Sequence, residues 1–278
     1  MKYLKRIADN VLQERLEAFG AVLVEGPKWC GKTTTSEQIA KSVIKLQDTD
    51  MREEYLAAAA RKPSILLQGS TPRLIDEWQD APVLWDAVRT TVDQRGMPGQ
   101  FILTGSNAVD NKAILHTGTG RISRMQMHTM SLWESGESNG KISLKQLFDD
   151  SSLDIDGITS DMQIEDIVFA ACRGGWPAAL NLRSDKAKLL IARDYVESVC
   201  KVDISKLDGV HRDFRVARML LRSYARNIST LAKHSAILAD ITSSGEVSLS
   251  DKTLDDYVGA LSKLFVINNM NAWCPVPV

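Results

Sequence analysis

The sequence predicts an α/β protein, with a core built on a mostly parallel sheet and a helical part after it. Between residues 21 and 107, short apolar runs typical of buried strands alternate with segments of helical periodicity. Beyond about residue 162, apolar residues recur mostly at helical spacing. Alternating strands and helices indicate parallel βαβ units, whereas the later helices indicate a separate part of the chain.

The first strand, over residues 21–24, leads into a glycine-rich loop. Residues 26–33 match G-x-x-x-x-G-K-[ST] at every fixed position, and residues 32–44 read as a helix. The two glycines let the backbone curl so that its N–H groups point at phosphate oxygens, at a helix N-terminus. In this pattern the lysine reaches the β- and γ-phosphates and the hydroxyl ligates Mg²⁺. The predicted nucleotide-binding residues are Gly26, Pro27, Lys28, Trp29, Cys30, Gly31, Lys32, Thr33 and Thr34.

An acidic pair follows a second strand, over residues 72–76, in the run Arg-Leu-Ile-Asp-Glu-Trp-Gln. Behind an apolar strand and downstream of a phosphate loop, Asp76 would hold Mg²⁺ opposite Thr33. Glu77 would be the general base that orients and activates the attacking water. Adjacent strand residues point to opposite faces, so the two carboxylates converge only if the strand ends here.

A third strand, over residues 100–107, ends in polar side chains. In phosphate-loop enzymes with a separate glutamate base, such a side chain contacts the γ-phosphate or the attacking water. Thr104, Ser106 and Asn107 are therefore candidate sensor residues. The alternative is that they are ordinary turn residues at a strand exit.

Residues 116–124 form a second glycine-rich stretch that contains Arg121 and Arg124. An arginine presented by such a loop could supply positive charge to the transition state, within the chain or from a neighbouring subunit. Arg121 is the candidate for this catalytic role, and solvated arginines on a flexible loop are the alternative. Arg173, in a Gly-Gly-Trp-Pro turn, could also reach the nucleotide, although a structural turn is favoured.

The composition is that of an ordinary globular protein, with 34 Lys and Arg against 35 Asp and Glu and a net charge of −1. No general attraction to nucleic acid or membrane follows from that balance. The four cysteines show no paired spacing, which favours reduced thiols over a zinc site or disulfides. Charged residues interrupt the first 19 positions and no long apolar window exists, so we expect a cytoplasmic protein without a signal peptide or membrane span.

The remaining elements complete a three-part organisation: a core over residues 1–136, an acidic linker over 137–161, and a helical part over 162–278. Helical spacing predicts a lead-in helix over 4–18 and further helices over 51–61 and from Pro82 to Arg95. Residues 42–46 suit another strand. The boundary is placed where basic residues disappear and acidic residues accumulate.

The helical part is predicted to hold helices over 186–206, 212–226, 228–241 and 250–264, then a short strand over 264–268. The last three of these helices, together with the strand, resemble a winged helix. Acids on the last helix favour a lid or docking role for it over base reading. On the helix over 212–226, a stripe of arginines is a candidate contact for nucleic-acid or nucleotide phosphates, with a solvated face as the alternative; it consists of Arg212, Arg215, Arg218, Arg222 and Arg226.

Taken together, these motifs resemble the prokaryotic AAA-type P-loop ATPases related to archaeal ATPases, which pair a P-loop core with a winged-helix segment. The Gly-Pro-Lys-Trp-Cys-Gly-Lys-Thr and Leu-Ile-Asp-Glu-Trp-Gln runs carry the resemblance, which extends over essentially the whole chain. It implies ATP binding at residues 26–34, with Asp76 and Glu77 as the acidic pair. Such proteins usually continue into a domain that resembles restriction endonucleases, and this sequence ends where that domain would begin.

Two functional readings follow. In the first, the chain is a Mg²⁺-dependent ATPase in which hydrolysis drives a conformational change. In the second, it is a nucleotide-gated module that binds DNA or a protein with negligible turnover. A homo-oligomer is a candidate assembly for either. The resemblance, and the lack of a guanine-recognition motif in the expected place, favour ATP over GTP.

Overall fold

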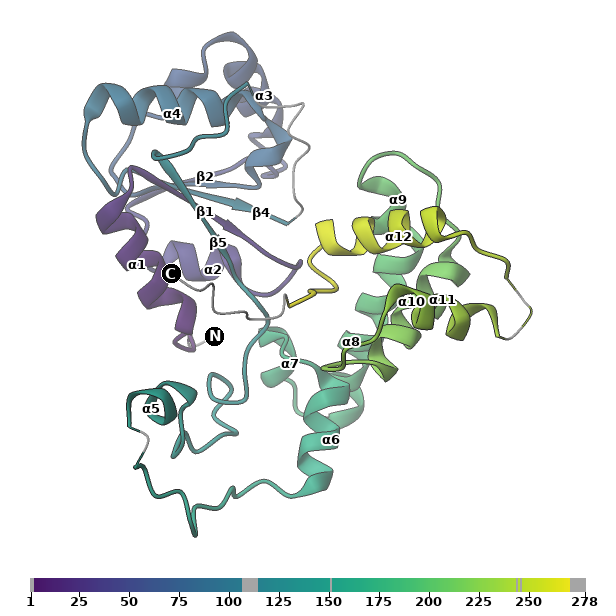
Figure 1. Ribbon diagram of the computed structural model, residues 1–278. Helices are drawn as coiled ribbons and strands as arrows, with labels where there is room; N and C mark the ends of the chain where they lie inside the picture. Colours follow the sequence, from purple (N-terminus) through teal and green to yellow (C-terminus); the bar gives the residue numbers. More distant parts are fainter. Residues whose placement is uncertain (1–2, 107–114, 151, 244, 246, 271–278) are drawn as a thin grey trace, which may run out of the picture. The chain divides into compact units, whose positions relative to one another are not determined.

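A computed structural model describes residues 3–106, 115–150, 152–243, 245 and 247–270 (Figure 1). The chain divides into two compact units, Met1–Ala192 and Arg193–Val278. The strands of the first unit are β1 Ala21–Glu25, β2 Ser42–Lys45, β3 Arg73–Asp76, β4 Phe101–Gly105 and β5 Ile122–Gln126. Its helices are α1 Ile7–Ala18, α2 Lys32–Glu37, α3 Arg52–Arg61, α4 Val83–Arg95, α5 Leu144–Asp149, α6 Ile164–Arg173 and α7 Pro177–Leu180.

The five strands form one sheet in the order β2-β3-β4-β1-β5, and every pairing is parallel. β1 lies between β4 and β5, with Ala21 opposite both Phe101 and Ile122. Parallel strands end at the same edge of the sheet, so the segments that follow β1, β3 and β4 emerge together. The predicted α/β fold with a mostly parallel sheet is confirmed.

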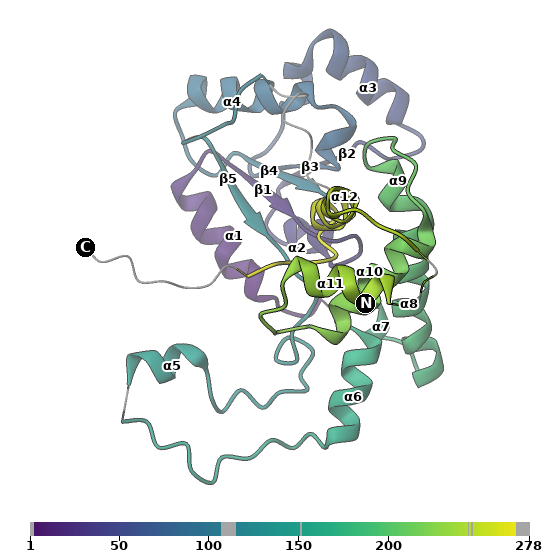
Figure 2. The ribbon, with the colours of Figure 1, turned by 45° about the vertical axis from the view of Figure 1, so that its right-hand side comes forward.

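Helices cover both faces of this sheet (Figures 1 and 2). On one face, α3 and α4 pack over a core that includes Trp78 and Trp85, whose ring centroids are 4.9 Å apart. On the other face lie α1, which buries Leu12 and Leu16, and α2. Strands covered on both faces are largely buried, which explains why β1 and β4 are rich in apolar residues.

Two predicted helices of the first unit are shorter in the structure, as is the helix predicted over 228–241 in the second unit, which begins at His234. The lead-in helix begins at Ile7 rather than residue 4. The helix after the loop ends at Glu37 and not at residue 44, because the Lys41 N–H already donates to the Pro72 carbonyl, 2.8 Å away, where the chain joins the sheet beside β3. The predicted strand over 42–46 and the helices over 51–61 and 82–95 are confirmed as β2, α3 and α4.

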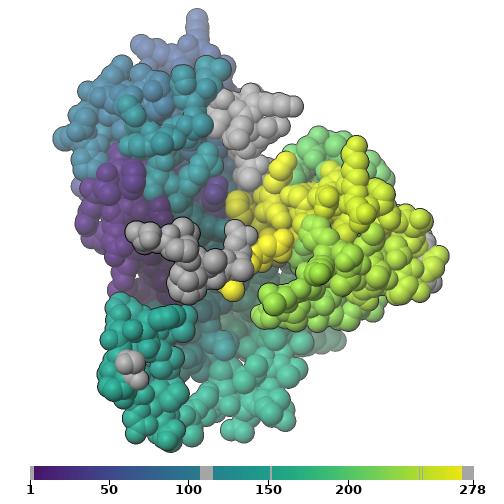
Figure 3. Space-filling view, viewed as in Figure 1, coloured from purple at the N-terminus to yellow at the C-terminus, as the bar shows by residue number. Residues whose placement is uncertain are grey.

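All the regular elements in the described part of the second unit are helices. α8 Asp185–Ser198 crosses into it and continues through a π-helical turn, Val199–Asp203, into α9 Ile204–Lys206. The remaining helices are α10 Phe214–Arg226, α11 His234–Thr242 and α12 Asp251–Lys263. These helices share one apolar core, centred on Leu220 and Leu261, and α11 and α12 form one packed surface in the space-filling view (Figure 3).

The strand predicted over 264–268 is wrong. α12 instead ends in a Schellman motif, in which the Val266 N–H donates to Leu261 O at 3.0 Å and the Phe265 N–H donates to Ser262 O at 2.9 Å. Phe265 has φ +57°, in the position usually taken by glycine. The apolar residues here pack back onto their own helices, so the described part of this unit lacks a strand that could form a wing.

Within the described residues, we find no helix whose length and apolar character would suffice to cross a membrane.

Candidate nucleotide-binding site

The glycine-rich loop joins the carboxyl end of β1 to the first residue of α2. Its two glycines have φ values of +155° at Gly26 and +102° at Gly31, which lie in the region that favours glycine. A Cβ on Gly26 would lie only 2.1 Å from the Met127 carbonyl oxygen. The loop therefore follows the backbone beyond β5 at a distance that no side chain at residue 26 would allow.

Lys32, the first residue of α2, is buried and turned into the loop. Its Nζ donates to the carbonyl oxygens of Gly26 and Pro27, each at 2.9 Å. Burial lowers the pKa of Lys32, and the charges of the nearby Asp76 and Glu77 carboxylates oppose that shift. The ammonium group thus lies inside the curl, within electrostatic reach of the acidic pair.

Asp76 ends β3 and accepts two hydroxyl hydrogen bonds on the same oxygen. Thr33 Oγ1 and Thr104 Oγ1 each donate to Asp76 Oδ1 at 2.6 Å. The first hydroxyl belongs to the loop helix and the second to β4. Three elements that are distant in sequence therefore meet at one carboxylate, at the carboxyl edge of the sheet.

Glu77 leaves the strand by adopting a left-handed conformation, with φ +56°. Its backbone N–H donates to Thr104 Oγ1 at 3.1 Å, so one hydroxyl contacts both acidic residues. Its carboxylate accepts hydrogen bonds from the Gln79 amide and, at 3.3 Å, from Ser106 Oγ. β3 ends at Asp76, as convergence of the two carboxylates requires.

The remaining residues predicted to form the loop differ in how far their side chains are exposed to solvent. Cys30 is fully buried, and burial raises the pKa of its thiol. Lys28, Trp29 and Thr34 are exposed, and the Trp29 side chain shows 67% of its surface to solvent. Asn107, the third candidate sensor, lies outside the residues that the structure describes.

Arg121 lies at the other end of the sheet from the loop. It immediately precedes β5, and its carbonyl oxygen accepts from the Ala21 N–H at 3.1 Å, where β1 begins. The five residues of β1, at about 3.3 Å each, separate that end from the loop by roughly 13 Å. Its Nε donates to Asp93 of α4 at 2.8 Å. A role for Arg121 at the loop of its own chain is therefore not supported, and only a role toward a neighbouring subunit stays open.

The other two arginines considered for the site are held elsewhere. Arg124 stacks over the Trp85 ring at 4.8 Å and lies 3.7 Å from the Glu25 carboxylate. Arg173 is buried and forms a double hydrogen bond to Glu137, at 2.7 and 2.9 Å. This pairing favours the structural reading of the Arg173 turn.

The arginine stripe of the second unit is smaller than the sequence suggests. Arg212 precedes α10 and is buried, where it donates to Asp208 and Asp256 at 2.8–3.0 Å. On α10, Arg218 pairs with Glu197 and Arg226 pairs with Asp240. Arg215 and Arg222 are exposed and form no carboxylate pair within the described residues.

Sequence reasoning did not single out several residues that shape the site. Gln79 contacts the Glu77 carboxylate. Arg6, at the start of α1, donates to the Cys30 carbonyl oxygen inside the loop at 2.7 Å, and its guanidinium is fixed by Glu134. Gln79 lies two residues beyond the acidic pair, but no spacing pattern connects Arg6 to a loop 24 residues away.

Comparison with known proteins gives two family matches. Residues 18–135 match a model described as an AAA domain, and residues 164–277 match one described as a domain of unknown function (DUF8612). Two uncharacterized proteins, from Mycobacterium bovis and Mycobacterium tuberculosis, are each 23% identical over 274 residues, which make up 97% of this chain and 54% of theirs. The chain thus spans about half the length of the curated relatives it matches.

Among solved structures, a Walker-type ATPase of Pyrococcus abyssi is similar with a TM-score of 0.50 and 15% identity, over 94% of this chain and 90% of that one. At that identity the likeness concerns the fold. The segment that matches the AAA-domain model thus contains the parallel sheet and the glycine-rich loop, which agrees with a P-loop fold over residues 18–135.

Proposed function

We propose that this protein binds ATP together with Mg²⁺ and hydrolyses it by attack of water on the γ-phosphate. One observation carries the proposal. The phosphate loop, the strand-ending acidic pair and the polar end of β4 meet at one edge of the sheet, where the Thr33 and Thr104 hydroxyls each donate to Asp76 at 2.6 Å and the Glu77 N–H donates to the Thr104 hydroxyl at 3.1 Å.

The loop would bind the phosphates through its backbone N–H groups at the start of α2, where the helix dipole favours negative charge. Lys32 now donates to two loop carbonyl oxygens, Gly26 O and Pro27 O. Phosphate oxygens are stronger acceptors for an ammonium group, so they would take the place of one or both carbonyls.

The residues present suit a magnesium ion. Thr33 Oγ1 and Asp76 Oδ1 lie 2.6 Å apart, and both are hard oxygen donors of the kind Mg²⁺ prefers. Mg²⁺ is commonly held by one or two carboxylates together with the phosphates of the nucleotide, so these two side chains and the nucleotide would suffice. When bound, the ion would neutralise charge on the β- and γ-phosphates.

Glu77 would act as the general base. In the proposed step, a water oxygen forms the bond to the γ-phosphorus, the bond from that phosphorus to the ADP oxygen breaks, and one water proton moves to the Glu77 carboxylate. Ser106 and Gln79 hold that carboxylate now, so they would set its direction toward the water. Thr104 would hold Asp76 and the Glu77 backbone in fixed relation.

ATP is favoured over GTP by the family match to an AAA domain and by the description of the Pyrococcus abyssi relative as a Walker-type ATPase. The same proposal includes four further features: a conformational change driven by hydrolysis, contact with DNA or a protein partner, a homo-oligomeric assembly and a cytoplasmic location.

The alternative, a nucleotide-gated module with negligible turnover, has one observation in its favour. Arg121 lies at the far edge of the sheet, and within the described part of the chain Arg6 is the one arginine whose side chain donates a hydrogen bond to the loop. Without an arginine at the γ-phosphate in addition to Lys32 and the metal ion, hydrolysis would be slow until a neighbouring subunit supplied one.

Steady-state ATP hydrolysis with Mg²⁺ distinguishes these functions when wild type is compared with Glu77→Gln and with a control, Glu53→Gln, an exposed acid on α3. We expect wild type and the control to turn over equally, and Glu77→Gln to bind ATP while losing at least a hundredfold in kcat. Binding without turnover in all three proteins, with or without DNA, would favour the gated module. Equal turnover in all three would contradict the role of Glu77.

A further inference from the structure

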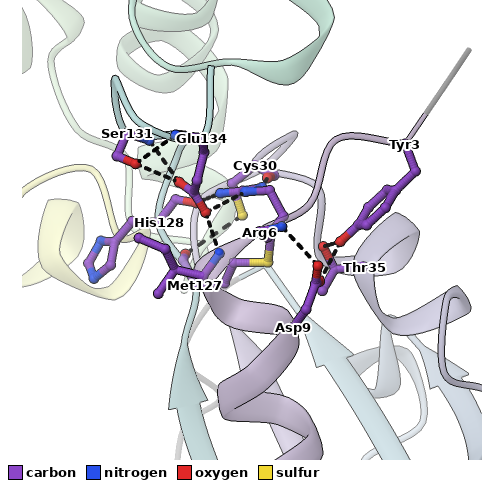
Figure 4. Close-up of polar contacts among 10 residues, drawn as sticks. Tyr3, Arg6, Asp9, Cys30, Thr35, Met127, His128, Ser131 and Glu134 are labelled. Atoms are coloured by element: carbon purple, nitrogen blue, oxygen red, sulfur yellow. Dashed lines mark hydrogen bonds and ion pairs between the residues drawn. The ribbon is translucent and has the colours of Figure 1, made fainter. Parts of the chain in front are cut away.

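A buried guanidinium contacts the backbone of the phosphate loop (Figure 4). It belongs to Arg6, the residue before α1, and only 4% of its surface is exposed. A buried arginine requires hydrogen-bond partners for its donors. The choice of those partners therefore shows what the residue holds in place.

Two of the three guanidinium nitrogen atoms of Arg6 donate to backbone carbonyls of separate segments. Nη1 donates to Cys30 O within the loop at 2.7 Å, and Nη2 donates to His128 O, beyond β5, at 2.8 Å. The third, Nε, donates to Glu134 Oε1 at 3.0 Å. Arg6 thus ties the loop to the same segment beyond β5 that approaches Gly26.

The Cys30 carbonyl is one end of a peptide group whose other end faces the opposite way. In a trans peptide the C=O and the following N–H point to opposite sides. A guanidinium that holds Cys30 O therefore directs the Gly31 N–H away from Arg6. Gly31 has φ +102°, and a Cβ there would lie 3.3 Å from Arg6 Nη1, so the loop is closely seated on this side chain.

Glu134 holds the guanidinium in turn. Its Oε1 also accepts from the Ile7 N–H at 2.7 Å, and its Oε2 accepts from the Ser131 N–H at 2.8 Å. Burial would raise the pKa of Glu134, but these hydrogen bonds and the one from Arg6 outweigh burial and hold the pKa below its ordinary value. The pair is therefore a fixed ionic contact anchored to the start of α1.

We infer that Arg6, held by Glu134, is a positioning residue of the nucleotide site, which presets the Gly31 N–H toward a phosphate of the bound nucleotide. The inference rests on the proposed nucleotide site and adds a residue outside both sequence motifs. Arg6 contacts the backbone of the loop, so its effect on the nucleotide passes through the Cys30–Gly31 peptide. Such preorganisation increases affinity because the loop loses less freedom on binding.

The test compares equilibrium binding of ATP and of ADP to the full chain in wild type, Arg6→Gln, Arg6→Lys and a matched control, Arg15→Gln. Arg15 lies on the same helix but donates to Ser123 of β5 at 2.6 Å, far from the loop. The hydrogen bond lost from Arg6 involves a charged group, so we expect both dissociation constants to rise about tenfold to a hundredfold in Arg6→Gln. Arg6→Lys should recover part of that loss, and Arg15→Gln should bind like wild type.

Unfolding midpoints without nucleotide separate positioning from a general structural role. The inference requires that the loss of affinity in Arg6→Gln exceed that in Arg15→Gln even where the two variants have similar midpoints, and that kcat at saturating ATP change less than KM. If Arg6→Gln does not fold, Glu134→Gln, which keeps an acceptor for Arg6, should still weaken binding several-fold. Wild-type affinity in Arg6→Gln, or in Glu134→Gln where only that variant folds, would overturn the inference and leave the proposed function standing. Absence of nucleotide binding in wild type would overturn both.

Discussion

Replacement of Thr104 by valine tests how the acidic pair is held. Thr104 is fully buried, and its hydroxyl donates to Asp76 Oδ1 at 2.6 Å and accepts from the Glu77 N–H at 3.1 Å. Valine keeps the shape of threonine and removes both hydrogen bonds. A bond to a charged group contributes about 1.5–3 kcal/mol and a neutral one about 0.5–1.5 kcal/mol. Because Asp76 and Glu77 are only partly buried, we take the lower ends and expect the free energy of unfolding to fall by about 2 kcal/mol.

The same change should slow catalysis. If that energy now keeps the two carboxylates in their working positions, its loss corresponds to roughly a thirtyfold fall in kcat. Denaturant unfolding and steady-state ATP hydrolysis measure the two effects. Thr104→Ser keeps the hydroxyl and should stay close to wild type, and Thr91→Val, which removes a hydroxyl that bonds Ala87 O on α4, should leave kcat unchanged. Wild-type stability and turnover in Thr104→Val would refute the bridging role of this hydroxyl.

Three further predictions concern other parts of the chain. The hydrogen bond from Arg212 lowers the pKa of Asp208 to about 2, so this carboxylate stabilises the fold above about pH 4 and the contribution is lost as the pH falls toward 2. The unfolding midpoint of Asp208→Asn should therefore depend less on pH in that range than the midpoint of wild type. An unchanged dependence would contradict the pairing. If the α10 stripe binds DNA phosphates, Arg215→Glu with Arg222→Glu should weaken DNA binding and reduce the salt slope by about two, whereas an unchanged salt titration would exclude the stripe. Gly26→Ala should abolish ATP binding, because its Cβ would lie 2.1 Å from a backbone oxygen; calorimetric titration that shows wild-type affinity would contradict the close approach.

The glycine-rich loop and the acidic pair could be located from the sequence because each is encoded locally. The loop pattern needs eight consecutive positions, and the acidic pair ends a strand whose apolar residues identify it. The joining of these motifs at one edge follows from a parallel sheet, which alternating strands and helices predict. Thr104 was identifiable for the same reason, since it lies near the end of the next strand.

Other features depend on which distant segments meet, and local patterns do not contain that information. The contact between Arg6 and Glu134 joins residues 128 positions apart. Arg121 lies in a glycine-rich segment of the kind that presents a catalytic arginine. Only the pairing of Ala21 with Ile122 shows that it lies at the amino end of the strands, opposite the phosphate loop. Phe265 ends α12 in a left-handed conformation that is typical of glycine. Because the residue is not a glycine, the sequence contains no signal for a helix end there, and the apolar residues around it suggest a strand.

The central claim is that the loop at the carboxyl end of β1 binds a nucleotide, and equilibrium titration of ATP with Mg²⁺ against wild type and Lys32→Ala tests it most directly. Lys32 is buried with its ammonium inside the curl, where it donates to Gly26 O and Pro27 O. We expect saturable binding by wild type and a loss of at least a hundredfold in affinity in Lys32→Ala, with the unfolding midpoint monitored as a control for folding. Equal affinity in a folded Lys32→Ala, or the absence of binding in wild type, would contradict the claim.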